Sequence, residues 1–463
     1  MNNQSPGLQE FKNLVGIKFQ LYNSLFTSLP FHRIEKTGIF LSLLLTYCEE
    51  GYHKKLSPLQ IVEDFFSKHS PEGTDREKVD ILFRFVQYVE RQVVLFDALE
   101  DAAFTSVNDM GGAGTLKHLF AEVDQYNKEK ELKEKLRDYA VRLVLTAHPT
   151  QFYPGPVLGI INDLSRAVIE NNAAQINTFM QQLGKTPFLK KQKPTPFDEA
   201  ISLIWYLENV FYHAAGRILS SLKNQFPDEV SDANPIIQMG FWPGGDRDGN
   251  PFVNTSTTLK VAESLRSTIL RCYYLDVRRL KRRLTFKEVD GIIAELEEQL
   301  YQELFNPNPK TPLTVEGMLN AMGRIREILI YQNNGLFLNL VDNFISKIRI
   351  FGFHFATLDL RQDSSVHTQV LRTIMKKEKS FPEDYESLTD KEKIKVLSKL
   401  RPLADISFTD ELVNDTLASI RAAKTIQEKN GPLGCNRYII SQCTSALSIM
   451  EVYGLFLLTG WKK

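Results

Sequence analysis

Most of the chain shows the hydrophobic period of amphipathic helices. The pattern is clearest over residues 75–100, where apolar side chains recur at steps of three and four. These side chains are Leu82, Phe85, Val86, Val89, Val93 and Phe96. Thr74 and Glu77 stand before them at capping-box spacing. The pattern predicts a long helix whose apolar stripe lies in the core.

Further helical patterns cover three windows, at 258–282, 284–304 and 314–333. Proline-containing breaks at 184–196 and 306–312 interrupt the helical period, because proline cannot continue a helix. The charged stretch 376–399 predicts a loop and a solvated helix. No internal repeat and no clean linker is present, so we expect one helix-rich unit over residues 1–463.

Four short apolar runs have a different pattern, typical of buried strands, and each ends in polar, charged or glycine-rich residues. They cover 141–145, 236–239, 348–360 and 438–440. Helical stretches separate these runs. This alternation is typical of a β/α barrel, in which chemistry gathers on the loops at the C-terminal ends of several strands. The sequence therefore predicts a mainly α-helical α/β fold with about four barrel strands.

His148 follows the first of these runs, within TAHPTQ at 146–151. A histidine there can act as a general base, because its unperturbed pKa lies near neutral pH. Pro149 disfavours helix at residue 148, so extended backbone is expected. A lone histidine is more often packed or solvated. The three other segments built on the same plan favour the functional interpretation.

Arg361 ends the third run, just before a predicted helix start at Ser364 or Ser365. An arginine fork binds phosphate well, and a helix N-terminus adds N–H groups and a favourable dipole. The alternative is a structural ion pair with Asp359 or Asp363. Phosphate contact is the favoured interpretation.

The segment 244–251, GGDRDGNP, follows the second run. Its glycines allow the backbone to approach a ligand closely, and Arg247 is a candidate for either a substrate contact or a structural pair. The acidic spacing resembles a calcium loop, but Pro251 stands where that loop needs glycine and Thr257 where it needs glutamate. A loop that shapes the barrel mouth, with Trp242 packed beneath it, is the better interpretation. Ser441, Thr444 and Ser445 are interpreted as structural, as candidate caps of the last helix. His354 is interpreted as a residue of a barrel layer.

The composition narrows the class of protein. Lys plus Arg and Asp plus Glu both number 56, so no basic excess points to nucleic acid. The four cysteines are scattered without a CxxC pair, which supports neither a zinc ribbon nor a disulfide framework. The N-terminal residues do not resemble a signal peptide, and the longest apolar run is too short to span a bilayer. We therefore expect a cytoplasmic protein without nucleic-acid or membrane partners.

The motifs together resemble those of phosphoenolpyruvate carboxylase, in the same order and spacing over essentially all 463 residues. The motifs are ERQVVLFDALEDAAF at 90–104, TAHPTQ at 146–151, GGDRDGNP at 244–251, FGFHFATLDLRQDSSVH at 351–367 and YIIS at 438–441. The later family signatures, namely a lysine motif, a glycine loop and acidic metal ligands, have no counterpart here. The resemblance therefore implies the N-terminal half of a helix-rich (β/α)8 TIM-type barrel. A half-barrel leaves open strand edges, which proteins normally pair or cover.

The resemblance implies that phosphoenolpyruvate and bicarbonate are joined to give oxaloacetate and phosphate, through carboxyphosphate and an enolate. It places His148 as the base that takes the proton of carboxyphosphate, and Arg361 at the substrate phosphate. It also implies Mg²⁺ or Mn²⁺ on ligands in the absent half, so no metal ligand is assigned here. The complete protein is expected to be a homotetramer. Two arginines that follow TAHPTQ in many members are missing at 152–156, which makes sugar-phosphate activation doubtful.

Two alternatives to this interpretation remain open. In the first, the chain is a truncated, non-catalytic relative that acts as a binding module. In the second, it is one subunit of a split enzyme whose second chain supplies the lysine and the metal carboxylates. In each case the 463-residue chain alone is expected to be inactive.

Overall fold

Contacts divide the chain into two compact units, one of residues 1–119 with 149–193 and the other of 120–148 with 194–463. The sequence suggests a single unit, whereas the contacts show that the chain changes unit after residues 119, 148 and 193. The computed structural model describes residues 6–28, 37–146, 153, 155–188, 194–227, 236–248, 250–306, 312–377, 381–403 and 408–462.

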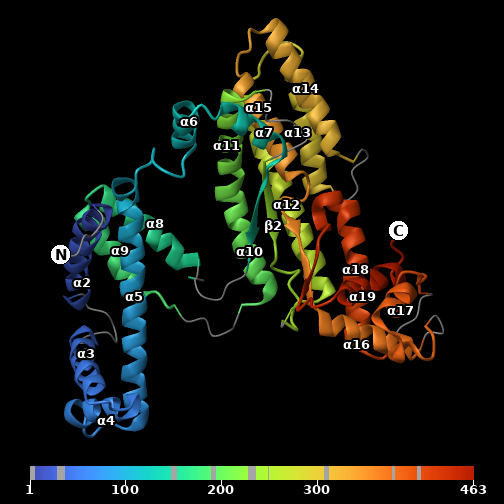
Figure 1. The fold of residues 1–463 in the computed structure, drawn as a ribbon. Coiled ribbons are helices and arrows are strands. Elements are labelled where there is room, and N and C mark those ends of the chain that lie inside the picture. Colours follow the sequence, from blue (N-terminus) through green and yellow to red (C-terminus); the bar gives the residue numbers. More distant parts are fainter. Residues whose placement is uncertain are drawn as a thin grey trace. The chain divides into compact units, whose positions relative to one another are not determined.

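The first unit is helical wherever it has regular structure in the described residues (Figure 1). Its elements are α1 (Pro6–Phe11), the π-helical η1 (Lys12–Gly16), α2 (Ile17–Ser28), α3 (Thr37–His53), α4 (Pro58–His69), α5 (Asp75–Val107), α8 (Gly155–Ile169) and α9 (Ala173–Lys185). Helix α6 (Leu116–Gln125) starts in this unit and ends in the second.

Helix α5 confirms the long helix expected from the sequence, and it starts at the predicted capping box. The Thr74 backbone N–H donates to Glu77 at 2.8 Å, and the Glu77 N–H donates to Thr74 Oγ1 at 3.4 Å. This reciprocal pair satisfies two backbone donors that the helix start leaves open.

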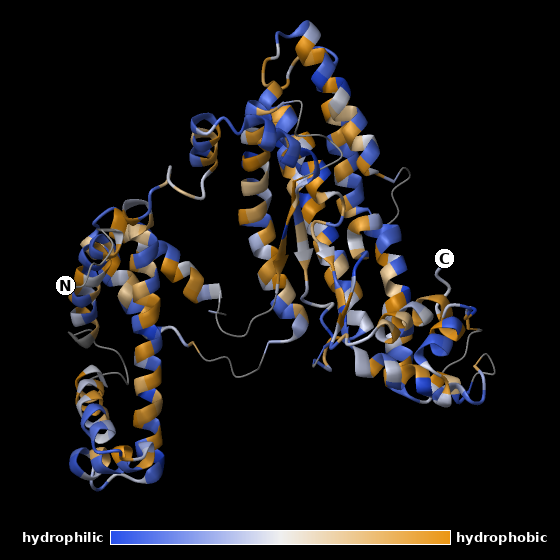
Figure 2. Ribbon diagram, viewed as in Figure 1, coloured by the Kyte–Doolittle hydropathy of each residue, from blue (hydrophilic) through white to orange (hydrophobic). Residues whose placement is uncertain are grey.

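The predicted apolar stripe of α5 is only partly buried. Phe85 lies in the core, but Val86, Val89 and Val93 are 54%, 42% and 46% exposed. The buried face instead carries residues such as Leu95, which packs in a cluster with α8 and α9. The prediction failed because α5 has apolar residues around much of its circumference, so periodicity alone does not identify the covered side (Figure 2).

The second unit combines helices with short strands, and α15 packs against strand β2 (Figure 1). Its elements are α7 (Glu129–Asp138), β1 (Val141–Leu145), α10 (Pro196–Tyr206), η2 (Leu207–Phe211), α11 (Tyr212–Gln225), β2 (Ile237–Phe241), α12 (Thr255–Lys281), α13 (Val289–Phe305), α14 (Val315–Gln332), α15 (Leu338–Phe351), β3 (Thr357–Leu358), β4 (Leu360–Asp363), α16 (Ser364–Met375), η3 (Tyr385–Ser387), α17 (Asp390–Leu397), α18 (Glu411–Asn430), η4 (Pro432–Cys435), β5 (Tyr438–Ser441) and α19 (Ala446–Leu458). Helices α12, α13 and α14 confirm the three windows predicted from periodicity.

The strands of this unit are parallel and follow one another in chain order. β1 pairs with β2, and β2 pairs with β3. A single residue, Asp359, separates β3 from β4, and β4 pairs with β5. Residues 357–363 therefore pair first with β2 and then with β5. This arrangement confirms a helix-rich α/β fold with parallel strands, while the closed barrel stays a prediction.

The third apolar run begins as helix rather than strand. Residues up to Phe351 belong to α15, and only 357–363 are extended. The expectation of a strand from Ile348 onward was wrong because Phe344, Ile345 and Ile348 continue a helical period. Gly352, with φ +46°, then ends the helix.

Apolar and polar residues alternate along most helices of both units (Figure 2). Among the ranges that the structure describes, no helix combines the length and apolar character needed to cross a membrane.

Candidate functional site

The candidate site is built around Trp242, at the C-terminal ends of β1 and β2 and beside the first residues of β4. The Trp242 backbone N–H donates to Leu145 O at the end of β1, at 2.9 Å. The Trp242 carbonyl accepts from the N–H groups of Gly245 and Asp246, each at 2.9 Å. These bonds form a tight turn that brings the residues after β2 back over the strand ends.

Two glycines make this turn possible. Gly244 has φ +81°, and a Cβ there would lie 2.6 Å from the side chain of Val261. A Cβ on Gly245 would lie 2.1 Å from the carbonyl oxygen of Asp359. The Gly245 carbonyl accepts from Arg361 N–H at 2.9 Å. The close approach predicted for these glycines is thus made to the protein's own strand.

Arg361, at the second position of β4, is held by two carboxylates. Its Nη1 lies 2.9 and 3.0 Å from the two oxygens of Asp246, and its Nη2 lies 2.6 Å from Asp248. The guanidinium carbon lies 5.2 Å from the ring centroid of Trp242. The structural alternative for Arg361 was an ion pair with Asp359 or Asp363. The observed partners are instead Asp246 and Asp248 of the glycine-rich turn. They fix the plane of the guanidinium on the indole face.

Arg247 lies beside Arg361. Its backbone N–H donates to the carbonyl of Arg361 at 2.9 Å, and its side chain is buried. Arg247 Nη2 pairs with Asp415 of α18, while its Nη1 is buried without a hydrogen-bond partner among the described residues. A structural pair is therefore present, and substrate contact stays a prediction.

Asp415 joins this turn to two helices. Besides Arg247, it accepts from the N–H and Oγ1 of Thr255, at 3.0 and 2.8 Å, at the start of α12. Burial alone would raise the pKa of Asp415, but the hydrogen bonds from Thr255 and the charge of Arg247 outweigh it and lower the pKa. The carboxylate is thus kept ionised and links α12, α18 and the turn.

A second ion pair lies across the strands. Arg142 of β1 places Nη2 2.7 and 2.8 Å from the carboxylate oxygens of Asp359, whose side chain is fully buried. Trp242 Nε1–H donates to the same carboxylate at 3.1 Å. Asp359 therefore orients the indole on which Arg361 lies.

The remaining candidates have separate outcomes. His148 lies outside the described residues, so its role stays a prediction. Ser445 confirms its structural role, since it caps α19 by accepting from Ser448 N–H at 3.4 Å. Ser441 lies on β5 instead of at a cap. His354 is buried in the turn before β3, where burial lowers its pKa to about 4.

The described residues do not fit a metal site. Within them, no group of three or more His, Cys, Asp or Glu side chains is arranged to hold a metal ion. Asp246 and Asp248, the acidic pair nearest the turn, are engaged by Arg361. The expectation that Mg²⁺ or Mn²⁺ ligands lie elsewhere therefore stays a prediction.

Sequence reasoning missed Arg142 and Asp415. Arg142 carried a signal, because it is the one charged residue in the apolar run 141–145. A lone charge in an apolar run needs a partner, which points to a network. Asp415 carried no such signal, since acidic residues are common in the first turn or two of a helix.

Comparisons with known proteins agree with these motifs. A family model described as phosphoenolpyruvate carboxylase matches residues 81–311 and 297–463. A phosphoenolpyruvate carboxylase of Gloeobacter violaceus is 25% identical over 80% of this chain and 47% of its own length. One of a Synechococcus strain is 25% identical over 73% of this chain and 40% of its own length. A phosphoenolpyruvate carboxylase of Nitrosomonas eutropha is 24% identical over 70% of this chain and 41% of its own length. The chain thus spans less than half the length of these relatives.

Proposed function

The chain belongs to the phosphoenolpyruvate carboxylase family, and we propose on that premise that it supplies the N-terminal portion of a carboxylase site. The reaction joins phosphoenolpyruvate to bicarbonate and yields oxaloacetate and phosphate. The matched relatives carry this enzyme's name, and the family match covers the segments that form the candidate site.

The roles we propose follow the chemistry of the side chains. His148 takes the proton of carboxyphosphate, because a neutral imidazole is a base near neutral pH. Carbon dioxide is then released beside the enolate of pyruvate, which a closed site keeps from water. Arg361 binds the substrate phosphate. Arg247 contributes a further donor through Nη1, for which the described residues provide no hydrogen-bond partner.

One observation carries the proposal: the two arginine-bearing motifs meet at the strand ends. Arg247 N–H donates to Arg361 O at 2.9 Å, although 114 positions separate the two residues in the numbering of the chain. Segments that meet where parallel strands end are where β/α folds place their chemistry, and Arg247 follows the end of β2.

The charges around the turn support the proposal that the site is incomplete. Around the turn, Arg142, Arg247 and Arg361 meet four carboxylates, those of Asp246, Asp248, Asp359 and Asp415. A phosphate ester needs an excess of positive charge, which these residues do not provide. We propose that cationic groups outside the described residues complete the site. No step is assigned to a metal ion, because the described residues offer it no ligand set.

The test starts with the native protein from the source organism. Its intact mass and the reading frame past codon 463 show whether the natural chain exceeds 53.0 kDa. That protein is then assayed for oxaloacetate formation from phosphoenolpyruvate and bicarbonate. We expect His148→Asn to abolish product and Arg361→Gln to lower kcat/KM by about a hundredfold or more. The matched controls are His53→Asn and Arg326→Gln.

Each outcome has a definite meaning. Turnover in the native protein that is lost in His148→Asn supports the proposal. Normal turnover in His148→Asn contradicts the proposed base. If the native mass equals that of this chain, the chain is mixed with candidate partner chains. Activity only in such a mixture supports a split enzyme, and no activity in any mixture supports the non-catalytic alternative.

A further inference from the structure

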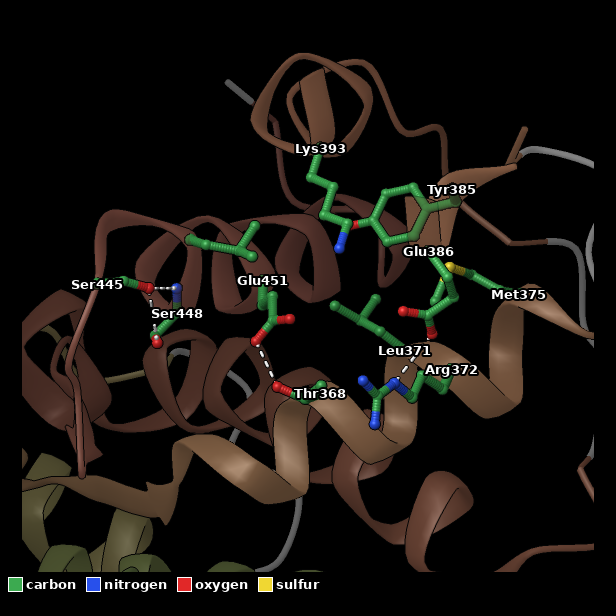
Figure 3. A pocket seen from close by; sticks show the side chains of 11 residues that line it. Thr368, Leu371, Arg372, Met375, Tyr385, Glu386, Lys393, Ser445, Ser448 and Glu451 are labelled. Carbon is green, nitrogen blue, oxygen red and sulfur yellow. Dashed lines mark hydrogen bonds and ion pairs between the residues drawn. The ribbon is translucent and has the colours of Figure 1, made fainter. Parts of the chain in front are cut away.

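A cavity of about 160 Å³ lies between α16, η3, α17 and α19 of the second unit (Figure 3). None of its lining residues belongs to the candidate site described above. Those that matter for its chemistry are Thr368, Arg372, Tyr385, Glu386, Lys393 and Glu451.

Tyr385 lines this cavity, and its hydroxyl lies buried behind the cavity wall. The residue is 6% exposed, and its Oη has no hydrogen-bond partner among the described residues. Burial first, and then the charge of Glu451, raises the pKa of Tyr385 to about 12, so the hydroxyl stays protonated. A buried donor without an acceptor is costly, and native structures rarely leave one empty. The cavity lies beside this hydroxyl, and a ligand that displaces the atoms covering it supplies the missing acceptor.

The charged residues at the cavity fall into two groups. Arg372 and Glu386 pair with each other at 2.9 Å, and their side chains are 58% and 59% exposed. That pair forms the rim. Lys393 and Glu451 are different, because no ion pair joins either of them to another described residue within 4.0 Å. An acidic and a basic side chain thus line one small cavity without contacting each other.

Glu451 and Lys393 are both positioned by neighbours. Glu451 is buried and accepts from Thr368 Oγ1 at 2.8 Å, and burial raises its pKa. Lys393 Nζ lies 5.7 Å from the ring centroid of Tyr385, on the aromatic face. Figure 3 shows the Lys393 amine, the Tyr385 ring and the Glu451 carboxyl facing the same space.

The N-terminus of α19 also favours an anionic group in the cavity. Ser445 and Ser448 line the cavity at the N-terminus of this 13-residue helix. A helix N-terminus favours negative charge. An anionic group is therefore favoured near Lys393, Tyr385 and the helix start, and a hydrogen-bond-donating or positive group is favoured near Glu451.

We propose that this cavity binds a small amphoteric molecule. Its acidic group accepts hydrogen bonds from Lys393 Nζ and Tyr385 Oη, and its amino group donates to Glu451. Both unpaired charges and the unpartnered hydroxyl are satisfied at once by such a ligand. A simple anion would leave Glu451 unpaired, and a simple cation would leave Lys393 and Tyr385 unpaired. This inference does not depend on the carboxylase proposal.

Three probes with the same three-carbon chain separate these cases. β-Alanine carries both charges, propionate carries only the carboxylate, and propylammonium carries only the amine. The 463-residue chain is titrated with each probe by isothermal titration calorimetry. We expect β-alanine to bind at least about tenfold more tightly than either single-charge probe, because each of these leaves a buried partner unsatisfied.

Variants locate the binding. Tyr385→Phe removes one hydroxyl that has no partner among the described residues, so the fold is preserved, and β-alanine affinity is expected to fall at least about fivefold. Glu451→Gln is expected to remove the preference for β-alanine over propionate. Lys391→Met, which removes a positive charge from the exposed surface of α17, is the control and leaves affinity unchanged. Equal binding of all three probes, no binding of β-alanine, or unchanged affinity in Tyr385→Phe would overturn the proposal and leave a cavity that holds water.

Discussion

Arg142 reaches Asp359 across the intervening strand β2, with Nη2 2.7 and 2.8 Å from the two carboxylate oxygens. The guanidinium passes over Gly240, where a Cβ would lie only 2.5 Å from Arg142 Nη2. Glycine at position 240 therefore leaves the space that the Arg142 side chain needs to reach Asp359. The pair in turn fixes Trp242, whose indole N–H donates to the same aspartate.

Gly240→Ala should break this arrangement. The added methyl displaces the guanidinium and leaves the fully buried Asp359 carboxylate without its charged partner. We expect the free energy of unfolding of the second unit to fall by about 3 kcal/mol, in the range for a broken buried ion pair. The three tryptophans, Trp205, Trp242 and Trp461, all lie in that unit, so urea unfolding followed by tryptophan fluorescence measures it.

Gly323→Ala is the matched control for that substitution. Gly323 lies inside α14, and a Cβ there would meet nothing within 4 Å. Alanine is favoured over glycine in a helix interior, so a gain of about 0.5–1 kcal/mol is expected. Equal effects of the two substitutions would show that Arg142 has another route to Asp359.

His367 predicts a pH dependence of stability. The residue is buried on α16, its Nε2 lies 2.8 Å from Tyr438 Oη, and burial lowers its pKa to about 4. The unfolded chain binds a proton near pH 6.5, the ordinary value. Between pH 6.5 and pH 4 the unfolded state therefore holds more protons than the folded state. Stability is full above this window and is lost as the pH falls through it, by up to about 1.4 kcal/mol per pH unit.

His367→Gln should flatten this part of the pH profile, measured by urea unfolding at several values of pH. Tyr438→Phe removes the hydrogen bond but leaves the imidazole buried, so the slope should persist in that variant. A slope that is the same in His367→Gln and in the unmodified protein would show that other groups cause the dependence. His354, whose pKa burial also lowers to about 4, would then be the next candidate.

Two buried tyrosines should respond differently to loss of the hydroxyl. Tyr212 Oη donates to Asp276 at 2.8 Å, a carboxylate that also pairs with Lys347 at 2.8 Å. Tyr212→Phe should cost about 1.5–3 kcal/mol, as for a hydrogen bond to a charged group. Tyr385→Phe removes a hydroxyl that has no partner in the described part of the chain, so stability should be unchanged or about 1 kcal/mol higher.

Urea unfolding, followed by tryptophan fluorescence without added ligand, measures the free energy of unfolding of both variants. A large loss of stability in Tyr385→Phe would mean that the hydroxyl has an acceptor in the protein. That result would remove one support of the amphoteric-ligand site, independently of any binding assay.

The helices and the strand ends were predictable because their signals are local. The Thr74–Glu77 capping box starts α5 as expected, and the apolar run 141–145 forms β1. Local signals also misled where two periods overlapped. Ile348 sits in an apolar run that satisfies both a strand and a helix, and the helix up to Phe351 prevailed. This helix packs against α11 and α14, and those neighbours could not be identified from the sequence.

The side-chain partners of the candidate site were less predictable, because they come from distant segments. Arg361 had two acidic neighbours in sequence, Asp359 and Asp363, yet it pairs with Asp246 and Asp248. On an extended strand, side chains two residues apart share a face but point in parallel, so they do not meet. A carboxylate from the adjoining turn has the better approach. Which turn adjoins a strand is a property of the fold.

The exposed valines of α5 give the last prediction, which concerns the first unit. Val86 is 54% exposed, whereas Leu95 on the same helix is fully buried among α8 and α9. Val86→Gln should change the free energy of unfolding by no more than about 0.5 kcal/mol, while Leu95→Ala should cost about 2–5 kcal/mol. Thermal unfolding by far-ultraviolet circular dichroism measures both variants. Tryptophan fluorescence, which reports the second unit, is the internal control and should not move in either. A loss in Val86→Gln as large as in Leu95→Ala would mean that the apolar face of α5 around Val86 is covered in solution.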